Sequence, residues 1–288
     1  MKITKHIRDF LKLFLTLAIT ILIILFFSYT ILKNVPQKFH FQLNTQNINT
    51  IPDITITYPI ECNKNLVSNS KDAKNLCQQI QTYKNDTIFL SHPLTYTNKN
   101  KPKLIFYIHG QDELINTHIS NNEKFRSKLQ DWGKLYANNN YIFIAPNLYG
   151  NNWGSQKALD LLSNEIRYYA DYFNVSKVYL IGYSMGGLLT YKISAQNPKM
   201  FHEVTILAGT LPFDILNYDS CKNLNKTKIT IFHGTKDINV PYTASSKLIV
   251  DKCHSYKFKY PELHLLKDID HWQLGYTNNP KILLPENK

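Results

Sequence analysis

Residues 177–188 read KVYLIGYSMGGL, an apolar run that leads into Gly-x-Ser-x-Gly around Ser184 and then into a helical pattern. A serine between two glycines at such a junction is typical of a nucleophile elbow, a tight strand-to-helix turn that exposes the serine hydroxyl. Glycines at 182 and 186 let the turn close because they carry no side chain. The N-terminus of the following helix favours negative charge near the serine. The pattern therefore predicts a reactive serine, with an ordinary Gly-rich turn as the alternative.

Six apolar runs of strand length recur from residue 103 onward, separated by helix-length segments: 104–108, 141–145, 177–181, 203–207, 228–232 and 262–266. Continuous apolar strands that alternate with helices indicate a parallel sheet covered on both faces. Apolar residues at steps of three or four predict one helix from Ala158 to Phe173, and a second runs from Gly186 to about Asn197.

Two β-rich runs precede this pattern, at 54–58 and 87–90, and we expect early strands there that could form an antiparallel pair. Together these runs predict one α/β domain over residues 51–288. It should contain about eight strands in a mostly parallel sheet, with helices on both faces.

Two further polar residues follow predicted strands. Asp237 lies in HGTKDINVP (233–241) and His271 in DIDHW (268–272). The carboxyl ends of parallel strands meet at one edge of a sheet, where Ser184 also lies. A serine nucleophile needs a base, and the base needs an acid that orients it. Asp268 and Asp270 compete for the acid role, but carboxylates so close to His271 in sequence rarely align with its Nδ1.

With GYSMGG, HGTKDINVP and DIDHW, the chain resembles the α/β-hydrolase superfamily over about residues 50–275. The resemblance extends to small esterase-like branches, those of dienelactone hydrolases, feruloyl esterases and prolyl oligopeptidases, without favouring one. It implies that Ser184 is the nucleophile, His271 the general base and then acid, and Asp237 the orienting acid.

The resemblance also implies an oxyanion hole, whose first donor is the backbone N–H of Met185. The second is assigned to the backbone N–H of Gln111, because YIHGQD (107–112) resembles the family's His-Gly loop although its extra glycines are missing. We interpret His109 and His233 as structural residues that brace their loops.

About 20 residues separate Leu207 from Lys228, too few for an independent cap. Loops 111–122 and 146–155 should then shape an open site, with Tyr149 and Trp153 as walls or as ordinary packing residues. An open site favours small or surface-accessible esters. We therefore expect a serine hydrolase of carboxylic esters; the same residues would also serve a peptidase or thioesterase, and the fold could serve as a catalytically silent binding protein.

Cofactor and nucleic-acid sites are not predicted. The sequence has no HExxH, GxGxxG or GxxxxGK[ST] pattern, so we expect no metal, nucleotide or flavin. The net charge of +12 comes from 33 basic and 21 acidic residues, but only three are arginines and the lysines are scattered. That distribution argues against a nucleic-acid groove.

The N-terminal region contains 20 consecutive uncharged residues at 13–32, about the length of a bilayer-spanning helix. Basic residues precede the run, so the positive-inside rule keeps residues 1–12 in the cytoplasm. We expect a transmembrane anchor at 13–32, a linker at 33–50 and an extracytoplasmic catalytic domain. The alternative is a signal peptide cleaved near Ser28–Thr30, which would release a secreted or periplasmic domain.

Four cysteines, an even number, would meet oxidising conditions in an exported chain. Three pairings are open. The pairing of Cys62 with Cys77 and of Cys221 with Cys253 closes the shortest loops, and the second bridge would bracket the Asp237 loop.

Overall fold

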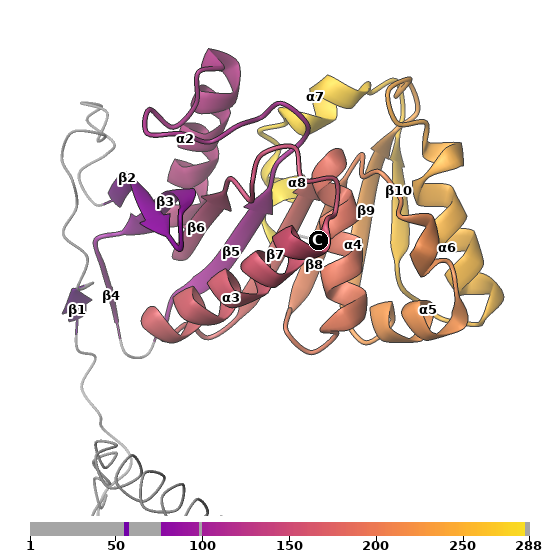
Figure 1. Cartoon of the computed structure of the whole chain (residues 1–288), viewed down its shortest axis with the longest axis horizontal. Helices are drawn as coiled ribbons and strands as arrows, with labels where there is room; N and C mark the ends of the chain where they lie inside the picture. Colours follow the sequence, from indigo (N-terminus) through magenta and orange to yellow (C-terminus); the bar gives the residue numbers. More distant parts are fainter. Residues whose placement is uncertain (1–54, 58–75, 98–99, 286–288) are drawn as a thin grey trace, which may run out of the picture. The chain divides into compact units, whose positions relative to one another are not determined.

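The computed structural model describes residues 55–57, 76–97 and 100–285. An eight-stranded sheet lies at the centre of the described domain, in the order β10-β9-β8-β7-β5-β6-β3-β2 (Figure 1). Its strands are β2 (Leu76–Tyr83), β3 (Asp86–Pro93), β5 (Lys103–Ile108), β6 (Tyr141–Pro146), β7 (Val178–Tyr183), β8 (Glu203–Leu207), β9 (Lys228–Gly234) and β10 (Glu262–Leu266).

The strands from β5 to β10 pair in parallel, and β3 pairs antiparallel with both β2 and β6. Each of the six predicted apolar runs forms one of these parallel strands. The expectation of a mostly parallel sheet is confirmed, because long apolar runs are the sequence pattern of strands buried on both faces.

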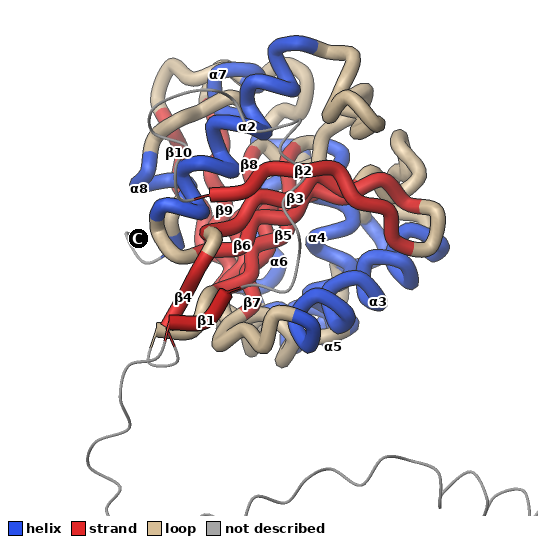
Figure 2. The backbone as a smooth tube through the Cα atoms, turned by 90° about the vertical axis from the view of Figure 1, so that its left-hand side faces the viewer, coloured by secondary structure: helices blue, strands red, loops and turns tan. Residues whose placement is uncertain are grey.

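Helices cover both faces of the sheet (Figure 2). One apolar cluster joins the sheet to α3 (Gln156–Tyr172), α4 (Met185–Gln196), α5 (Tyr218–Leu224) and α6 (Ser246–Ser255). The other joins it to α2 (Glu123–Asn138), α7 (His271–Gly275) and α8 (Pro280–Leu283). Two 3-10 turns, η3 (Phe213–Ile215) and η4 (Tyr242–Ala244), complete the connections. Alternate residues of each central strand therefore belong to different clusters, as the pleat requires.

Both helices expected from periodicity are present as α3 and α4. Ser155 caps α3, where its side chain accepts the Ala158 N–H, and Pro198 follows the end of α4. The side chain of Asn122 caps α2 in the same way, at the Phe125 N–H. These caps occupy N–H groups that lack partners within the helix.

The early strands pair differently from the expectation. The run at 87–90 lies in β3, whose partner is β2, with Ile80 opposite Phe89. The run at 54–58 contains β1 (Thr55–Thr57), which pairs antiparallel with β4 (Thr95–Thr97) in a separate two-stranded sheet. The expected pairing was wrong because β2, rich in glutamine, lacks the apolar alternation that marks a strand.

The N-terminal expectations, namely the cytoplasmic segment at 1–12, the span at 13–32 and the linker at 33–50, lie outside the described residues. In the part of the chain that is described, no helix is long and apolar enough to cross a membrane.

The expected bridge between Cys221 and Cys253 is present and joins α5 to α6, with 5.1 Å between the Cα atoms. Cys77 is disulfide-bonded as well. Cys62, its expected partner, lies outside the described residues.

Candidate active site

Ser184 lies at the junction between β7 and α4 with φ of 51° and ψ of −118°. This left-handed backbone is strained for a residue with a side chain. A Cβ added at Gly182 would lie 2.1 Å from Thr190 Oγ1, and one added at Gly186 would lie 2.2 Å from the Ile108 carbonyl oxygen. The two glycines are therefore needed for the close approach of the backbone at the turn, as expected for a nucleophile elbow.

Three residues from separate loops meet at the carboxyl end of the sheet. His271 Nε2 lies 2.9 Å from Ser184 Oγ, and His271 Nδ1 lies 2.7 Å from Asp237 Oδ2. Because an ionised carboxylate only accepts hydrogen bonds, Nδ1 carries the imidazole proton and Nε2 is free to accept the serine hydroxyl. The geometry thus brings together Ser184, Asp237 and His271, and it can activate a serine oxygen for nucleophilic attack.

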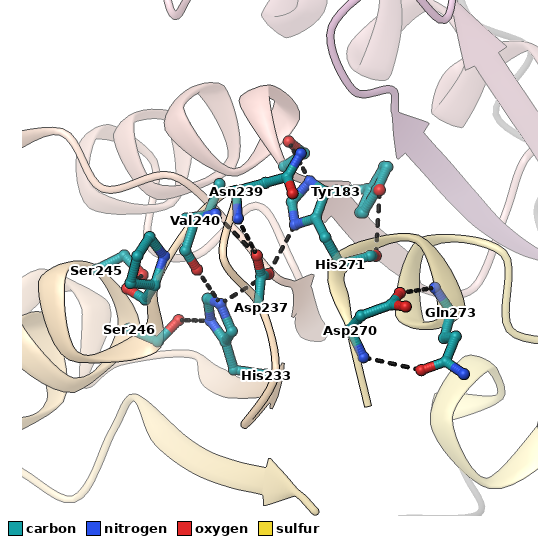
Figure 3. Close-up of polar contacts among 12 residues, drawn as sticks. Tyr183, His233, Asp237, Asn239, Val240, Ser245, Ser246, Asp270, His271 and Gln273 are labelled. Atoms are coloured by element: carbon teal, nitrogen blue, oxygen red, sulfur yellow. Dashed lines mark hydrogen bonds and ion pairs between the residues drawn. The ribbon is translucent and has the colours of Figure 1, made fainter. Parts of the chain in front are cut away.

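The Asp237 carboxylate is held on both oxygens, as Figure 3 shows. Oδ1 accepts the backbone N–H groups of residues 239 and 240, at 3.0 and 2.8 Å. Oδ2 faces His271 and also His233 Nε2, at 3.2 Å. Burial raises the pKa of Asp237, but the hydrogen bonds from His233, His271 and Val240 outweigh it and hold the pKa well below the usual range. The carboxylate therefore stays ionised at neutral pH.

His233 braces the loop that carries Asp237. Its Nε2 lies 2.7 Å from the Val240 carbonyl oxygen, and its Nδ1 lies 2.7 Å from Ser246 Oγ. Because Nε2 faces two acceptors, Val240 O and Asp237 Oδ2, it carries a proton and donates to them.

The competing aspartates have other partners. Asp270 caps the N-terminus of α7 through a reciprocal pair of hydrogen bonds to Gln273, visible in Figure 3. Asp268 is exposed and pairs with Lys236 at 3.1 Å. The carboxylate in contact with the imidazole is that of Asp237.

Two backbone N–H groups are available beside Ser184. Met185 is the first residue of α4, so its N–H has no partner within the helix. The neighbours of Gln111 are both occupied: the Gly110 N–H donates to Glu113 Oε2 at 2.9 Å, and the Asp112 N–H donates to Asn151 Oδ1 at 2.8 Å. Among the described residues the Gln111 N–H donates no hydrogen bond. These two amides could stabilise an oxyanion.

A cavity of about 590 Å³ opens over Ser184 and His271. Gln111, Asp112 and Trp153 line it, as do residues of segments 210–213 and 239–245 and Trp272. Trp153, Phe213 and Trp272 are each about half exposed or more. Trp153 thus forms a wall of the cavity and is not an ordinary packing residue, which was the other alternative. Tyr149 does not line the cavity; its ring lies under Lys157 Nζ, 3.9 Å from the ring centroid.

No group of three or more His, Cys, Asp or Glu side chains could hold a metal ion in the described ranges. The cavity is lined by Ser184 and His271 and by aromatic rings, while Asp237 lies behind His271.

Charged residues beneath the site were not expected from the sequence. Lys128 is buried and pairs with Glu113 at 3.0 Å. The available signal was its spacing: Phe125, Lys128 and Trp132 lie at steps of three and four on one helix face. A lysine within an apolar stripe indicates a buried partner of opposite charge.

Comparisons with known proteins agree with this architecture. Residues 151–273, which include Ser184, Asp237 and His271, match a family model described as phospholipase/carboxylesterase. A search of curated proteins found no match.

Two solved structures with TM-scores above 0.5 share the fold at low sequence identity. A thermostable esterase is 18% identical with a TM-score of 0.53, over 69% of this chain and 56% of its own. A protein from Bacteroides ovatus titled as a putative dipeptidyl aminopeptidase IV is 13% identical with a TM-score of 0.51, over 68% of this chain and 32% of its own. A further structure, titled as that of a predicted CIB-like hydrolase from Thermoplasma acidophilum, is 17% identical with a TM-score of 0.48, over 73% of this chain and 92% of its own. The family match over residues 151–273 and the sheet order show that the chain has the α/β-hydrolase fold, and they confirm the expected resemblance to that superfamily.

Proposed function

We propose that this protein is a serine hydrolase that cleaves carboxylic esters through an acyl-enzyme on Ser184. The observation that carries the proposal is the continuous series of contacts from Ser184 Oγ to His271 and on to Asp237, at 2.9 and 2.7 Å. The match to the phospholipase/carboxylesterase model supports ester cleavage.

In the proposed reaction, His271 Nε2 takes the hydroxyl proton as Ser184 Oγ attacks the acyl carbon. The carbonyl oxygen becomes an oxyanion that accepts the N–H groups of Met185 and Gln111. Collapse breaks the ester bond, and the leaving alkoxide takes the proton from His271. Water then attacks the acyl-enzyme by the same route and releases the acid. Asp237 keeps the imidazole in the required tautomer and stabilises its cationic form.

The substrate side of the proposal rests on the cavity. Trp153, Phe213 and Trp272 present exposed aromatic surface around the opening, which suits an apolar acyl or aryl group. The 20 residues between β8 and β9 hold only short helices, η3 and α5, with no separate cap domain. Esters that are small or exposed at a surface fit this opening.

A fluorophosphonate probe and a panel of p-nitrophenyl esters test the function on the full chain in detergent. We expect labelling at Ser184 that is lost in Ser184→Ala, with kcat lower by at least about 10³-fold. Asp237→Asn should lower kcat about 10²–10⁴-fold, while the matched Asp268→Asn and Asp270→Asn should each cost less than about tenfold.

Other outcomes separate the alternatives. Hydrolysis of peptide or thioester substrates in preference to every ester would identify a peptidase or thioesterase. If the wild-type protein is neither labelled by the probe nor active on any substrate, the remaining alternative is a catalytically silent binding protein. A Ser184→Ala variant as active as the wild type would contradict the proposal.

We also propose that residues 13–32 anchor the protein and that the hydrolase domain lies outside the cytoplasm. The uncharged run with basic residues before it supports the anchor, and the Cys221–Cys253 bridge suits an oxidising compartment. N-terminal sequencing of the purified protein should find the Met1 side intact, with detergent required for solubility. A soluble species that begins near Ile31 would identify a cleaved signal peptide instead.

A further inference from the structure

A buried ion pair lies on the α2 face of the sheet. Lys128 Nζ is 3.0 Å from Glu113 Oε1, and the two side chains are only 2% and 3% exposed. The Tyr107 hydroxyl bridges them: it accepts from Lys128 Nζ at 2.6 Å and donates to Glu113 Oε2 at 2.9 Å. Charges so deeply buried are costly unless they are paired and hydrogen-bonded, as these are.

Aromatic rings enclose the ammonium group of Lys128. Five ring centroids lie 4.6–5.3 Å from Nζ, those of Tyr107, Phe125, Trp132, Tyr183 and Tyr276. Their faces attract a cation. Because the rings hold the ammonium group in place, its ion pair also holds the carboxylate of Glu113 in place.

The pair reaches the candidate active site through Gly110. The second Glu113 oxygen, Oε2, accepts the Gly110 N–H at 2.9 Å. On its other side Gly110 packs against the Tyr183 ring, so closely that an added Cβ would lie 3.0 Å from two ring carbons. Gly110 is therefore held between the Glu113 carboxylate and the Tyr183 ring. The N–H of the next residue, Gln111, belongs to the peptide bond between Gly110 and Gln111.

Tyr183 connects the same cluster to the other parts of the site. It directly precedes Ser184, and its hydroxyl donates to the His271 carbonyl oxygen at 3.3 Å (Figure 3). Its ring centroid is 5.1 Å from that of His271. The cluster around Lys128 and Glu113 therefore contacts Gly110, which precedes Gln111, and Tyr183, which precedes Ser184. Through the Tyr183 hydroxyl it also reaches the backbone of His271.

We propose that Glu113, fixed by Lys128, is a positioning residue that aims the Gln111 N–H at the oxyanion through its hydrogen bond to Gly110. The inference rests on the proposed function and adds a residue pair to it. A donor acts on the transition state only when it is preorganised, and a misplacement of about 1 Å can cost about 10²-fold in rate. The carboxylate oxygen at Gly110 supplies that preorganisation.

Two double variants test the role of this acceptor. Glu113→Gln/Lys128→Met and Glu113→Leu/Lys128→Met both remove the buried charges, but only the first keeps an oxygen that can accept the Gly110 N–H. We would measure kcat and KM for p-nitrophenyl acetate and for its thionoester, in full-length protein. Sulfur accepts hydrogen bonds poorly, so a thionoester profits little from the oxyanion donors.

For Glu113→Leu/Lys128→Met we expect kcat for the oxygen ester to fall about 10–100-fold with KM within about threefold. The oxygen-ester to thionoester ratio of kcat/KM should fall about tenfold, because the loss belongs to oxygen alone. Glu113→Gln/Lys128→Met should lower both readouts by only about two- to fivefold, because an amide oxygen accepts the Gly110 N–H less strongly than a carboxylate does. Glu165→Gln, a buried change on the opposite face, serves as the control and should alter neither.

Equal activities and equal ratios in the two double variants would overturn the proposal, as would equal losses on both substrates. If the Leu variant does not fold, the Gln variant decides: an amide oxygen binds the N–H less strongly than a carboxylate does, so its ratio should fall measurably, and an unchanged ratio overturns the role. Failure of the proposed function is distinct, because the wild type would then neither label at Ser184 nor hydrolyse the ester.

Discussion

The α2 face and the α3 face of the sheet each bury a glutamate, but with opposite neighbours. On the α2 face, Glu113 lies 3.0 Å from Lys128 and accepts hydrogen bonds from Tyr107 and the Gly110 backbone. On the α3 face, Glu165 is fully buried and faces the carboxyl of Asp86. Within the described residues, neither oxygen of Glu165 has a hydrogen-bond partner at normal distance.

Burial raises the pKa of both carboxyls, and the neighbour decides the outcome. For Glu113 the charge of Lys128 and the hydrogen bonds from Gly110 and Lys128 outweigh burial, so its pKa is lowered. For Glu165 the charge of Asp86 adds to burial and raises its pKa to about 9. At neutral pH Glu113 is therefore charged and Glu165 keeps its proton. The charged glutamate is the one that lies beneath the candidate active site.

The largest effect is expected from removal of the cation. Lys128→Met leaves Glu113 buried without its partner and should cost about 3–5 kcal/mol of stability at pH 8. The folded-state pKa of Glu113 then rises above its unfolded value near 4.5. Stability is consequently retained below that value and lost as the pH rises, so the loss should be smaller at pH 5. Urea denaturation of the full-length protein at both pH values measures it.

Lys128→Arg is the matched control, since it keeps the charge in a larger group, and its loss should not depend on pH between 5 and 8. An equal loss for Lys128→Met at the two pH values would contradict the comparison. It would mean that the lysine contributes by packing its stem against the rings rather than by its charge.

Most of the sheet could be predicted from the sequence because its central strands are buried on both faces. Runs such as 104–108 and 141–145 are continuously apolar and cannot lie at a surface. The antiparallel edge could not be predicted in the same way. β2 contains Gln78, Gln79 and Gln81, and it is a strand only because β3 offers it an edge.

The serine, acid and imidazole follow from local patterns, because each lies just after a strand that the sequence predicts. Lys128 could not be placed this way. A lysine in a helix is ordinarily at the surface, and only the tertiary structure brings Glu113 and Tyr107 to it. The choice between Trp153 and Tyr149 as a cavity wall could not be predicted either, because both lie in the same loop with positive φ, and only the folded structure places Trp153 at the cavity and Tyr149 against Lys157.

An intermediate effect, of the opposite sign, is expected on the α3 face. Glu165→Gln removes a group that must stay protonated in the folded state. Because its folded pKa of about 9 exceeds the unfolded 4.5, the wild type loses stability as the pH rises between these values. The variant should therefore be about 1–3 kcal/mol more stable than the wild type at pH 8 and nearly equal to it at pH 4.5. Urea denaturation across that range measures the difference, and a destabilised variant at pH 8 would contradict the assignment of a protonated Glu165.

The smallest effect is expected from Asp86→Asn, which measures how much the carboxyl of Asp86 contributes to the raised pKa of Glu165. Asn keeps an oxygen for the Leu148 N–H, which Asp86 Oδ2 accepts at 3.0 Å, so this contact with the loop after β6 should survive. Removal of the charge lowers the pKa of Glu165, but burial, the larger cause, remains. We expect the variant to be more stable than the wild type by about 1 kcal/mol or less at pH 8. Its stability should begin to fall at the same pH as that of the wild type, but the fall should end at a lower pH. The pH profile of urea denaturation for Asp86→Asn, beside that of Glu165→Gln, measures both. A profile identical to the wild type would mean that burial alone holds the proton on Glu165, and the contrast with Glu113 would then come from Lys128 only.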